Sequence, residues 1–341
     1  MHCAVIILNW NGAELLRKYL PHLICHTSYP HVRLIVADNG STDDSLDVLE
    51  REFPQIEVIP FEKNYGFAEG YNRAISMVDE PIICLLNSDV RVAPKWIEHP
   101  LEAMSEDRNI AALQPKIRWD RDPKMFEYAG GAGGMLDRYG YPFCRGRVFD
   151  TLEEDRGQYD ASQILPVLWA SGAALFVRRE IYLALGGLDK RFFAHQEEID
   201  LCWRMNAGGY FVGVDTESVV YHYGGASLDM AHPKKTYLNF RNNLLLLYKN
   251  LVSDRYSSVM RMRFVLDMIS MVQFALTGKV AHAKAVYKAR KDFKRMKSDF
   301  AVDREENLRR TVNTSPQGIR TYSIVWRYFV GRKKTFSELE R

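Results

Sequence analysis

The segment HQEEIDLCWRMNAGG, residues 195–209, crowds three carboxylates into four positions: Glu197, Glu198 and Asp200. On a helix, Glu197 and Asp200 lie three residues apart and share a face. Like charges this close oppose one another, which can raise a carboxylate pKa toward that of a useful general base. An exposed acidic helix start, favoured by the helix dipole, is the alternative interpretation. The preceding loop GGLDKRFF, rich in glycine and aromatic residues, favours a site.

Polar residues also follow several apolar runs, at the strand ends where parallel sheets bind ligands. Asn9 and Asn11 follow one run, Asp38 ends a second, and Asn87 and Asp89 follow a third. A carboxylate at such an end can accept hydrogen bonds from a base or ribose. Asn87 and Asp89 lie on the same side of an extended chain, and oxygen ligands there could hold a hard divalent cation that also binds phosphates. Capped turns, rich in Asn, Ser and Asp, are the alternative.

Two further segments contain candidate ligand-binding residues. KNYGFAEGYNRA, with Gly66, Gly70 and Asn72, is a glycine-containing loop leading into a helix, whose N-terminus could meet a phosphate-bearing ligand. A glycine placed for close helix packing is the alternative. The segment matches neither GxxxxGK[ST] nor GxGxxG, so it predicts neither a P-loop nor a nicotinamide site. In VVYHYGG, His222 follows an apolar strand, and a lone His is more often structural than a ligand.

The elements that must position these residues alternate between strand and helix patterns. Continuous apolar runs are typical of strands buried on both faces of a sheet, and helical patterns separate them. This alternation predicts an α/β fold with a mostly parallel sheet covered by helices on both faces. The expected strands are 4–10, 34–38, 56–61 and 81–90, and the expected helices are 12–26, 43–53 and 67–78.

The composition is that of a globular protein with unevenly distributed charge. The 341 residues are 47% hydrophobic and 26% charged, which excludes a disordered chain, a collagen-like chain and a polytopic membrane protein. Residues 231–341 hold 24 Lys and Arg against 9 Asp and Glu, whereas residues 1–230 hold 22 against 34. We therefore expect an acidic domain over 1–230 and a basic helical region over 231–341. The acidic body argues against nucleic acid as a partner, and the basic region suggests contact with phosphates.

The five cysteines indicate a reducing compartment. They include no CxxC pair, and several lie in apolar runs. We expect reduced, mostly buried thiols rather than a disulfide or zinc framework. The N-terminal apolar run is too short for a signal peptide and lacks basic residues before it. The best candidate for a membrane span, residues 264–277, is short and contains Asp267, so no spanning helix is expected.

The basic region contains a helical pattern over residues 279–297. Lys284, Lys288, Lys291 and Arg295 fall on one face of that helix. A solvated helix packed on the domain is one interpretation. The other is a helix lying on an anionic membrane leaflet, which would bring the protein to a lipid-linked substrate.

Seven motifs in order resemble the family 2 glycosyltransferases, which have the GT-A fold. The likeness is greatest to the rhamnosyltransferase-like branch, which builds bacterial surface polysaccharide. Each motif alone is common, but their shared order is specific, and the resemblance covers about residues 3–250. The motifs are NWNG, DNGSTD, NYGFAEGYNRA, LLNSDV, GGLDKRFF, QEEIDLCWR and VYHYGG.

The resemblance implies roles for the residues at the strand ends. Asp38 matches the acid that contacts the nucleotide base and ribose. Asp89 matches the last acid of the metal-binding DxD motif, with Asn87 where that motif has its first Asp, and the branch commonly has LNPD there. His222 matches a late His that completes the metal and diphosphate site. Three further residues match the lining of the donor pocket: Asn9, Asn11 and Gly66.

The resemblance also implies a catalytic base and an acceptor-side wall. The family's base is the second acid of an ED pair, and here Glu198 falls at that position, after Glu197. Asp200 is the next candidate. The processive members' QxxRW motif is missing, so we expect one sugar, or a few, to be added per encounter. The segment WASGAALFVRR matches the acceptor-side wall, with Ser171, Gly172 and Ala173 near the acceptor.

The resemblance thus implies an inverting, non-processive glycosyltransferase that requires Mg²⁺ or Mn²⁺. Its donor would be a nucleotide-sugar, dTDP-rhamnose first and a UDP-hexose second, and its acceptor a glycan or a polyprenyl-linked glycan. We expect a cytoplasmic protein, peripheral at the inner face of the cell membrane. A sugar nucleotidyltransferase is one alternative, but no glycine-rich triphosphate loop with Arg or Lys lies near the first strand. A degenerate nucleotide-sugar-binding protein is the other.

Overall fold

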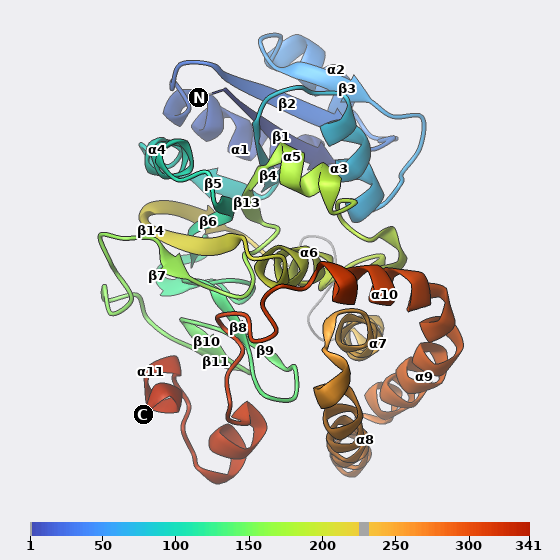
Figure 1. Cartoon of the computed structure of the whole chain (residues 1–341). Coiled ribbons are helices and arrows are strands. Elements are labelled where there is room, and N and C mark those ends of the chain that lie inside the picture. Colours follow the sequence, from blue (N-terminus) through green and yellow to red (C-terminus); the bar gives the residue numbers. More distant parts are fainter. Residues whose placement is uncertain (1, 225–231) are drawn as a thin grey trace.

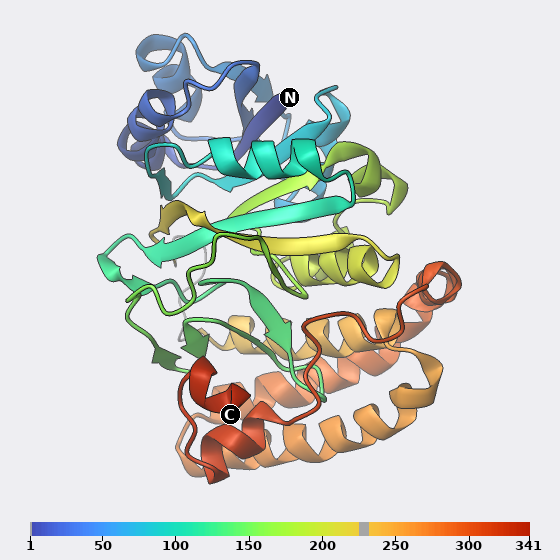
Figure 2. The same ribbon diagram turned by 60° about the vertical axis from the view of Figure 1, so that its left-hand side comes forward.

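The computed structural model describes residues 2–224 and 232–341. The boundary expected between residues 230 and 231 lies outside the described residues, as does Gly225 of the VYHYGG motif. Within them, ten strands form a large sheet (Figures 1 and 2). These strands are β1 Cys3–Asn9, β2 Val32–Asp38, β3 Glu57–Pro60, β4 Ile82–Asn87, β5 Val90–Val92, β6 Ile110–Trp119, β7 Asp122–Phe126, β12 Leu165–Pro166, β13 Ala174–Arg178 and β14 Phe211–His222.

Eight of these strands follow the order β12-β14-β6-β13-β4-β1-β2-β3. β1 is parallel to β2 and β4, β2 to β3, and β6 to β14, so the mostly parallel sheet is confirmed. β13 lies antiparallel between β4 and β6, which the sequence did not predict. Its residues are buried on both faces like those of the parallel strands, so their apolar pattern carries no information about direction.

Helices cover both faces of the sheet, as predicted. Val5 and Ile7 of β1 belong to one apolar core, and Ala4 and Ile6 belong to the other. Both faces are therefore buried, which explains why the strands read as continuous apolar runs. The helices are α1 Ala13–His26, α2 Ser45–Glu52, α3 Phe67–Ser76, α4 Glu98–Glu106, α5 Arg179–Ala184, α6 Glu197–Ala207, α7 Pro233–Asn250, α8 Ser253–Leu276, α9 Val280–Met296, α10 Ala301–Arg310 and α11 Phe336–Glu340, with short helical turns at Lys190–Phe192, Lys297–Phe300 and Trp326–Val330.

The expected helical C-terminal region is confirmed, and it packs against the rest of the protein. α7 contacts α6 and α9, and α9 contacts α8. After α10 the chain crosses back toward a small sheet (Figure 1). There the backbone N–H of Leu136 donates to Gly318 at 3.0 Å, and that of Arg320 donates to Leu136 at 2.8 Å. The small sheet comprises β8 Gly134–Leu136, β9 Pro142–Cys144, β10 Arg147–Val148 and β11 Thr151–Leu152.

All five cysteines are free thiols, and four of them are buried, as expected. Cys25 is exposed. Among residues 2–224 and 232–341, no helix combines the length and the apolar character needed to cross a membrane.

Candidate active site

The register of the parallel strands brings three predicted residues together. Asn9 pairs with Asp38 across β1 and β2, and Leu8, the residue before Asn9, pairs with Asn87 across β1 and β4. The side-chain amide of Asn9 donates to Asp38 Oδ1 at 2.9 Å. The carboxyl ends of three adjacent strands therefore form one polar edge, where ligands of such sheets bind.

Asp38 shapes the loop that follows β2. Its carboxylate accepts hydrogen bonds from the backbone N–H of Ser41 at 2.9 Å and from the Ser41 hydroxyl at 2.6 Å. Asp38 and Asn9 are buried, whereas Asn11 is exposed at the loop surface, where its Oδ1 accepts from the Thr42 backbone N–H at 2.7 Å. The buried side chains of Asp38 and Asn9 thus hold the loop at this edge in place, whereas Asn11 lies on the surface of the loop.

Gly66 lies opposite this loop, at the start of α3. Its φ of +80° belongs to the region that favours glycine, and a Cβ there would meet nothing within 4 Å. The buried side chain of Asn39, which the sequence analysis did not single out, holds the turn. Its amide donates to the Gly66 carbonyl at 3.1 Å, and its Oδ1 accepts from the Tyr65 N–H at 2.9 Å. The only clue in the sequence was the position of Asn39 in the motif DNGSTD, directly after Asp38.

Asp89 and His222 meet at the predicted metal corner. β5 and β14 are antiparallel, and Val90 pairs with His222, which places Asp89 Oδ1 3.1 Å from His222 Nε2. The Asn87 amide nitrogen lies 3.4 Å from the same His222 nitrogen. The other ring nitrogen, Nδ1, lies 3.4 Å from Glu127 Oε1 and has no hydrogen-bond partner among the described residues.

The electrostatics of this corner are those of a buried ion pair. Burial lowers the pKa of His222, but the carboxylates of Glu127 and Asp89 outweigh that effect and raise it to about 10. Burial raises the pKa of Asp89, but the hydrogen bond and charge of His222 outweigh that effect and lower it. Glu127 was missed by the sequence analysis because no motif marks it; the only clue was a carboxylate just after an apolar strand residue.

Oxygen and imidazole ligands fit a divalent cation such as Mg²⁺ or Mn²⁺. In the described parts of the chain, however, no group of three or more His, Cys, Asp or Glu side chains is arranged to hold a metal ion by itself. A cation bound by Asp89 and His222 would therefore need further ligands from a bound molecule, and diphosphate oxygens are suitable ones. Within the described parts of the chain, the buried Nδ1 of His222 makes no hydrogen bond, so it is available to a bound molecule.

The loop before α6 has a strained backbone. Phe193, His195 and Gln196 have φ values of +70°, +70° and +73°, a region that non-glycine residues rarely adopt. Each such residue costs on the order of 1–3 kcal/mol, and such strain clusters at functional sites. The side-chain amide of Asn242 on α7 donates to the carbonyls of Phe192, Ala194 and His195 at 3.0, 2.8 and 2.8 Å, which holds this conformation.

The strained loop delivers Glu197 and Glu198 to the first turn of α6. Burial, together with the charge of Glu198, raises the pKa of Glu197 well above its ordinary value, and Glu197 Oε2 has no partner. Burial also raises the pKa of Glu198, to about 7. The pKa of Glu198 is therefore suited to accepting a proton near neutral pH.

Asp200 has a different environment. It is completely buried, and both oxygens are engaged: Oδ2 accepts from Arg204 at 3.0 Å and Lys249 at 2.8 Å, and Oδ1 accepts from Asn250 at 2.7 Å. Burial raises the pKa of Asp200, but the charges of Arg204 and Lys249 outweigh that effect and lower it. The Asp200 carboxylate thus joins α6 to α7.

The acceptor-side segment connects the metal corner to the acid pair. The Asn87 backbone N–H donates to the Ala173 carbonyl at 2.9 Å, and the Ser171 N–H donates to buried Gln114 at 2.8 Å. A Cβ at Gly172 would lie 3.8 Å from Glu198 Cβ and 3.4 Å from Phe67. Glu198 therefore borders the same segment that is hydrogen-bonded to β4 next to Asp89.

The comparisons with known proteins agree with this fold. Residues 4–151 match the family model described as "Glycosyl transferase family 2". The N-acetylglucosaminyl-diphospho-decaprenol L-rhamnosyltransferase of Mycobacterium tuberculosis is 29% identical over 257 residues, covering 69% of this chain and 82% of that relative. The O-antigen biosynthesis protein RfbC of Myxococcus xanthus is 25% identical over 233 residues, covering 66% of this chain and 17% of that relative.

Solved structures show the same fold. GalNAc-T7 with UDP, GalNAc and Mn²⁺ superposes with a TM-score of 0.57 at 16% identity, covering 74% of this chain and 48% of that one. Residues 1–349 of TarS from S. aureus in complex with UDP-GlcNAc give 0.56 at 14% identity, covering 91% and 89%. The fold is therefore that of the GT-A glycosyltransferases. Residues 4–151 thus resemble glycosyltransferase family 2, as the ordered motifs indicated, and the chain is similar to a rhamnosyltransferase.

Proposed function

We propose that this enzyme transfers a sugar, with inversion, from a nucleoside diphosphate donor to a polyprenyl-linked glycan in bacterial surface polysaccharide synthesis. L-Rhamnose from dTDP-rhamnose is the first choice, because the mycobacterial relative is named as a rhamnosyltransferase acting on a lipid-linked N-acetylglucosamine. A UDP-hexose is the second. The observation that carries the proposal is the position of Glu198, a carboxyl with a raised pKa, beside the segment that adjoins the Asp89–His222 corner.

Glu198 is the proposed base. Its carboxylate would take the proton from the acceptor hydroxyl as that oxygen attacks C1 of the donor sugar. The new oxygen–C1 bond forms as the bond from C1 to the diphosphate oxygen breaks, and the nucleoside diphosphate leaves with the electron pair. A single displacement of this kind inverts C1. Asp200 is less suited to the role, because Arg204, Lys249 and Asn250 occupy its oxygens.

The edge formed by Asn9, Asn11, Asp38 and Gly66 is proposed to hold the nucleotide. Asp89 and His222 are proposed to hold Mg²⁺ or Mn²⁺ together with the diphosphate, and Mn²⁺ is present in the GalNAc-T7 structure. When bound, the cation would offset the negative charge that builds on the leaving diphosphate. Asn87 would add an amide beside this pair, and Ser171, Gly172 and Ala173 would border the acceptor.

A donor panel tests the proposal. Purified protein with Mg²⁺ or Mn²⁺ would be incubated with dTDP-rhamnose, UDP-glucose, UDP-galactose, UDP-N-acetylglucosamine or GDP-mannose and a short-chain polyprenyl-diphosphate N-acetylglucosamine. Release of nucleoside diphosphate, with a new glycolipid, from one donor is the expected result. A protein that binds one donor but releases nothing, with the acceptor present, would instead be a nucleotide-sugar-binding protein.

We also propose that the protein is cytoplasmic and peripheral at the inner face of the membrane. A polyprenyl-linked acceptor would be reached there, and the region 231–341 is basic. Lys284, Lys288 and Lys291 of α9 are exposed, as the membrane interpretation requires. Region 231–341 is nonetheless tied to the body through α7, so we propose it as a functional region rather than one that folds alone.

A further inference from the structure

The outward face of α8 is apolar along most of its length. Six of its hydrophobic side chains are between 38% and 83% exposed, and five of the six are spaced alternately by three and four residues. At about 100° per residue this spacing forms one stripe along the helix. The five, which we call the α8 stripe, are Met262, Val265, Ile269, Val272 and Leu276.

The opposite face of α8 carries the charges. Arg263 and Asp267 are buried, with Arg263 Nη2 3.3 Å from Asp267 Oδ1. Arg290 of α9 also contacts Asp267, and Arg263 contacts Asn243 of α7. A surface helix of a soluble protein normally turns its charges outward and its apolar stripe inward. α8 instead buries Arg263 and Asp267 and leaves its apolar stripe outside, without a partner among residues 2–224 and 232–341.

A second exposed apolar group lies at the same end of the molecule. Trp326, Phe329 and Val330 are 67%, 55% and 58% exposed. The segment Trp326–Val330 and α8 both lie along the lower edge of the molecule in Figure 1 and in Figure 2. The two views differ by a rotation about the vertical axis, so both segments lie at the same end of the molecule. An exposed Trp beside aliphatic side chains and Arg332 is typical of protein segments at a membrane–water interface.

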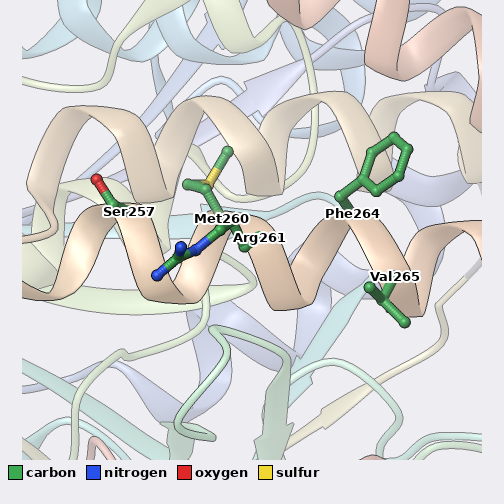
Figure 3. Close-up of a pocket in the computed structure, with 5 residues that line it drawn as sticks. All are labelled: Ser257, Met260, Arg261, Phe264 and Val265. Carbon is green, nitrogen blue, oxygen red and sulfur yellow. The ribbon is translucent and has the colours of Figure 1, made fainter.

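The charge of this part of the chain favours an anionic surface over a second copy. Residues 255–291 contain eight Lys and Arg, and their only acid is the buried Asp267. Two copies packed through α8 would bring like charges together, whereas an anionic leaflet attracts them. Arg261, Phe264 and Val265 line a hollow of about 690 Å³ beside the stripe, and the Arg261 side chain is directed along the helix toward the end that carries Ser257 (Figure 3). The hollow thus combines a cation with apolar groups, as in contacts with a phospholipid.

We propose that the α8 stripe and the segment Trp326–Val330 form a docking face that lies in the headgroup region of an anionic membrane. The helix would lie flat, with its apolar side chains among the acyl chains and its neighbouring cations at the phosphates. The proposed function supplies only the reason for docking, which is to reach a lipid-linked acceptor. Vesicle binding itself needs no catalysis, so the two can fail separately.

Vesicle co-sedimentation of the full chain tests the docking face. The vesicles would contain phosphatidylglycerol and phosphatidylcholine in equal amounts, or phosphatidylcholine alone. The double variant Ile269→Ser/Leu276→Ser should bind the anionic vesicles at least about tenfold more weakly, because it removes two large apolar side chains from the interface. Val302→Ser on α10, a matched change at a 79% exposed position, should bind like the wild type. Equal binding by the double variant and the wild type would overturn the proposal.

Tryptophan fluorescence gives a second measurement. The emission of the wild type should shift to the blue when anionic vesicles are added, and Trp326→Phe should remove most of that shift. Light scattering without lipid tests the second copy: a wild-type dimer that the double variant converts to a monomer, with vesicle binding unchanged, would overturn membrane docking. Turnover with a water-soluble acceptor should be equal in the wild type and the double variant, whereas transfer to the acceptor embedded in vesicles should fall. Loss of vesicle binding alone would leave the proposed reaction intact.

Discussion

Replacing Glu198 with glutamine should cost activity and increase stability. Burial raises the pKa of Glu198 from its ordinary 4.5 to about 7. Between these values the folded protein keeps a proton that the unfolded chain has lost, so the wild type loses stability as pH rises through this window and levels off above it. At 1.36 kcal/mol per pH unit, the interval corresponds to about 3 kcal/mol at most. Glutamine, which is neutral throughout, avoids that loss.

The measurements are thermal unfolding and turnover, each followed with pH. Near pH 4.5 the variant and the wild type should unfold at similar temperatures, and above pH 7 the variant should be more stable. Wild-type turnover should rise with pH through about 7 as the carboxylate ionises. The variant should lose this dependence and about 10²–10⁴-fold in kcat, the usual contribution of a general base. Donor binding should not change.

Glu197→Gln is the matched control, one position away. Burial raises the pKa of Glu197 well above its ordinary value, which favours its neutral form, and glutamine resembles that form closely. This control should keep most of the turnover and its pH dependence. Near-normal turnover in Glu198→Gln would move the base role to another residue. A Glu198→Gln variant less stable than the wild type at pH 8 would refute the argument that burial keeps this carboxyl protonated.

Three further substitutions test the surrounding site. Asp89→Ala should abolish the increase in donor affinity that Mg²⁺ or Mn²⁺ produces, because the diphosphate loses its cation; calorimetry with unchanged affinity in the presence of metal would contradict this. Glu127→Gln should lower the pKa of His222 from about 10, measured by NMR, and should weaken metal binding by about 10–100-fold if the carboxylate orients the imidazole. Lys249→Met should cost up to about 3–5 kcal/mol, measured by urea unfolding, because it removes the buried cation that Asp189 and Asp200 share and leaves them only Arg191 and Arg204.

The sequence predicted the parts of the site that depend on local pattern. Apolar runs mark the strands, and polar residues at their ends fall at one edge whenever the strands are parallel, so Asn9, Asp38 and Asn87 could be grouped before the fold was known. β13 could not be given a direction, because a strand buried on both faces has the same pattern either way. Glu127 could not be found because its partner, His222, lies far along the chain.

The roles of the three carboxylates at the start of α6 could not be predicted from their spacing. By spacing, Glu197, Glu198 and Asp200 are equivalent like charges on one helix turn. The structure separates them through Lys249, which is 49 residues beyond Asp200 and holds that carboxylate ionised. The pKa values of Glu197 and Glu198 are raised instead by burial against distant segments. Spacing identifies candidates, but tertiary contacts decide which carboxyl can accept a proton.

The orientation of α8 differs from that of most amphipathic surface helices. A surface helix usually turns its apolar side inward and its charges toward water. The structure buries Asp267 with Arg263 and Arg290 and leaves the apolar stripe outside. α7 connects the pair of helices α8 and α9 to the acid pair. Its Asn242 side chain holds the loop before Glu198, and α9, which contacts α8, packs against α7. The proposed docking at α8 and the proposed proton transfer at Glu198 therefore depend on one helix, which would place the base at a fixed position relative to the lipid surface.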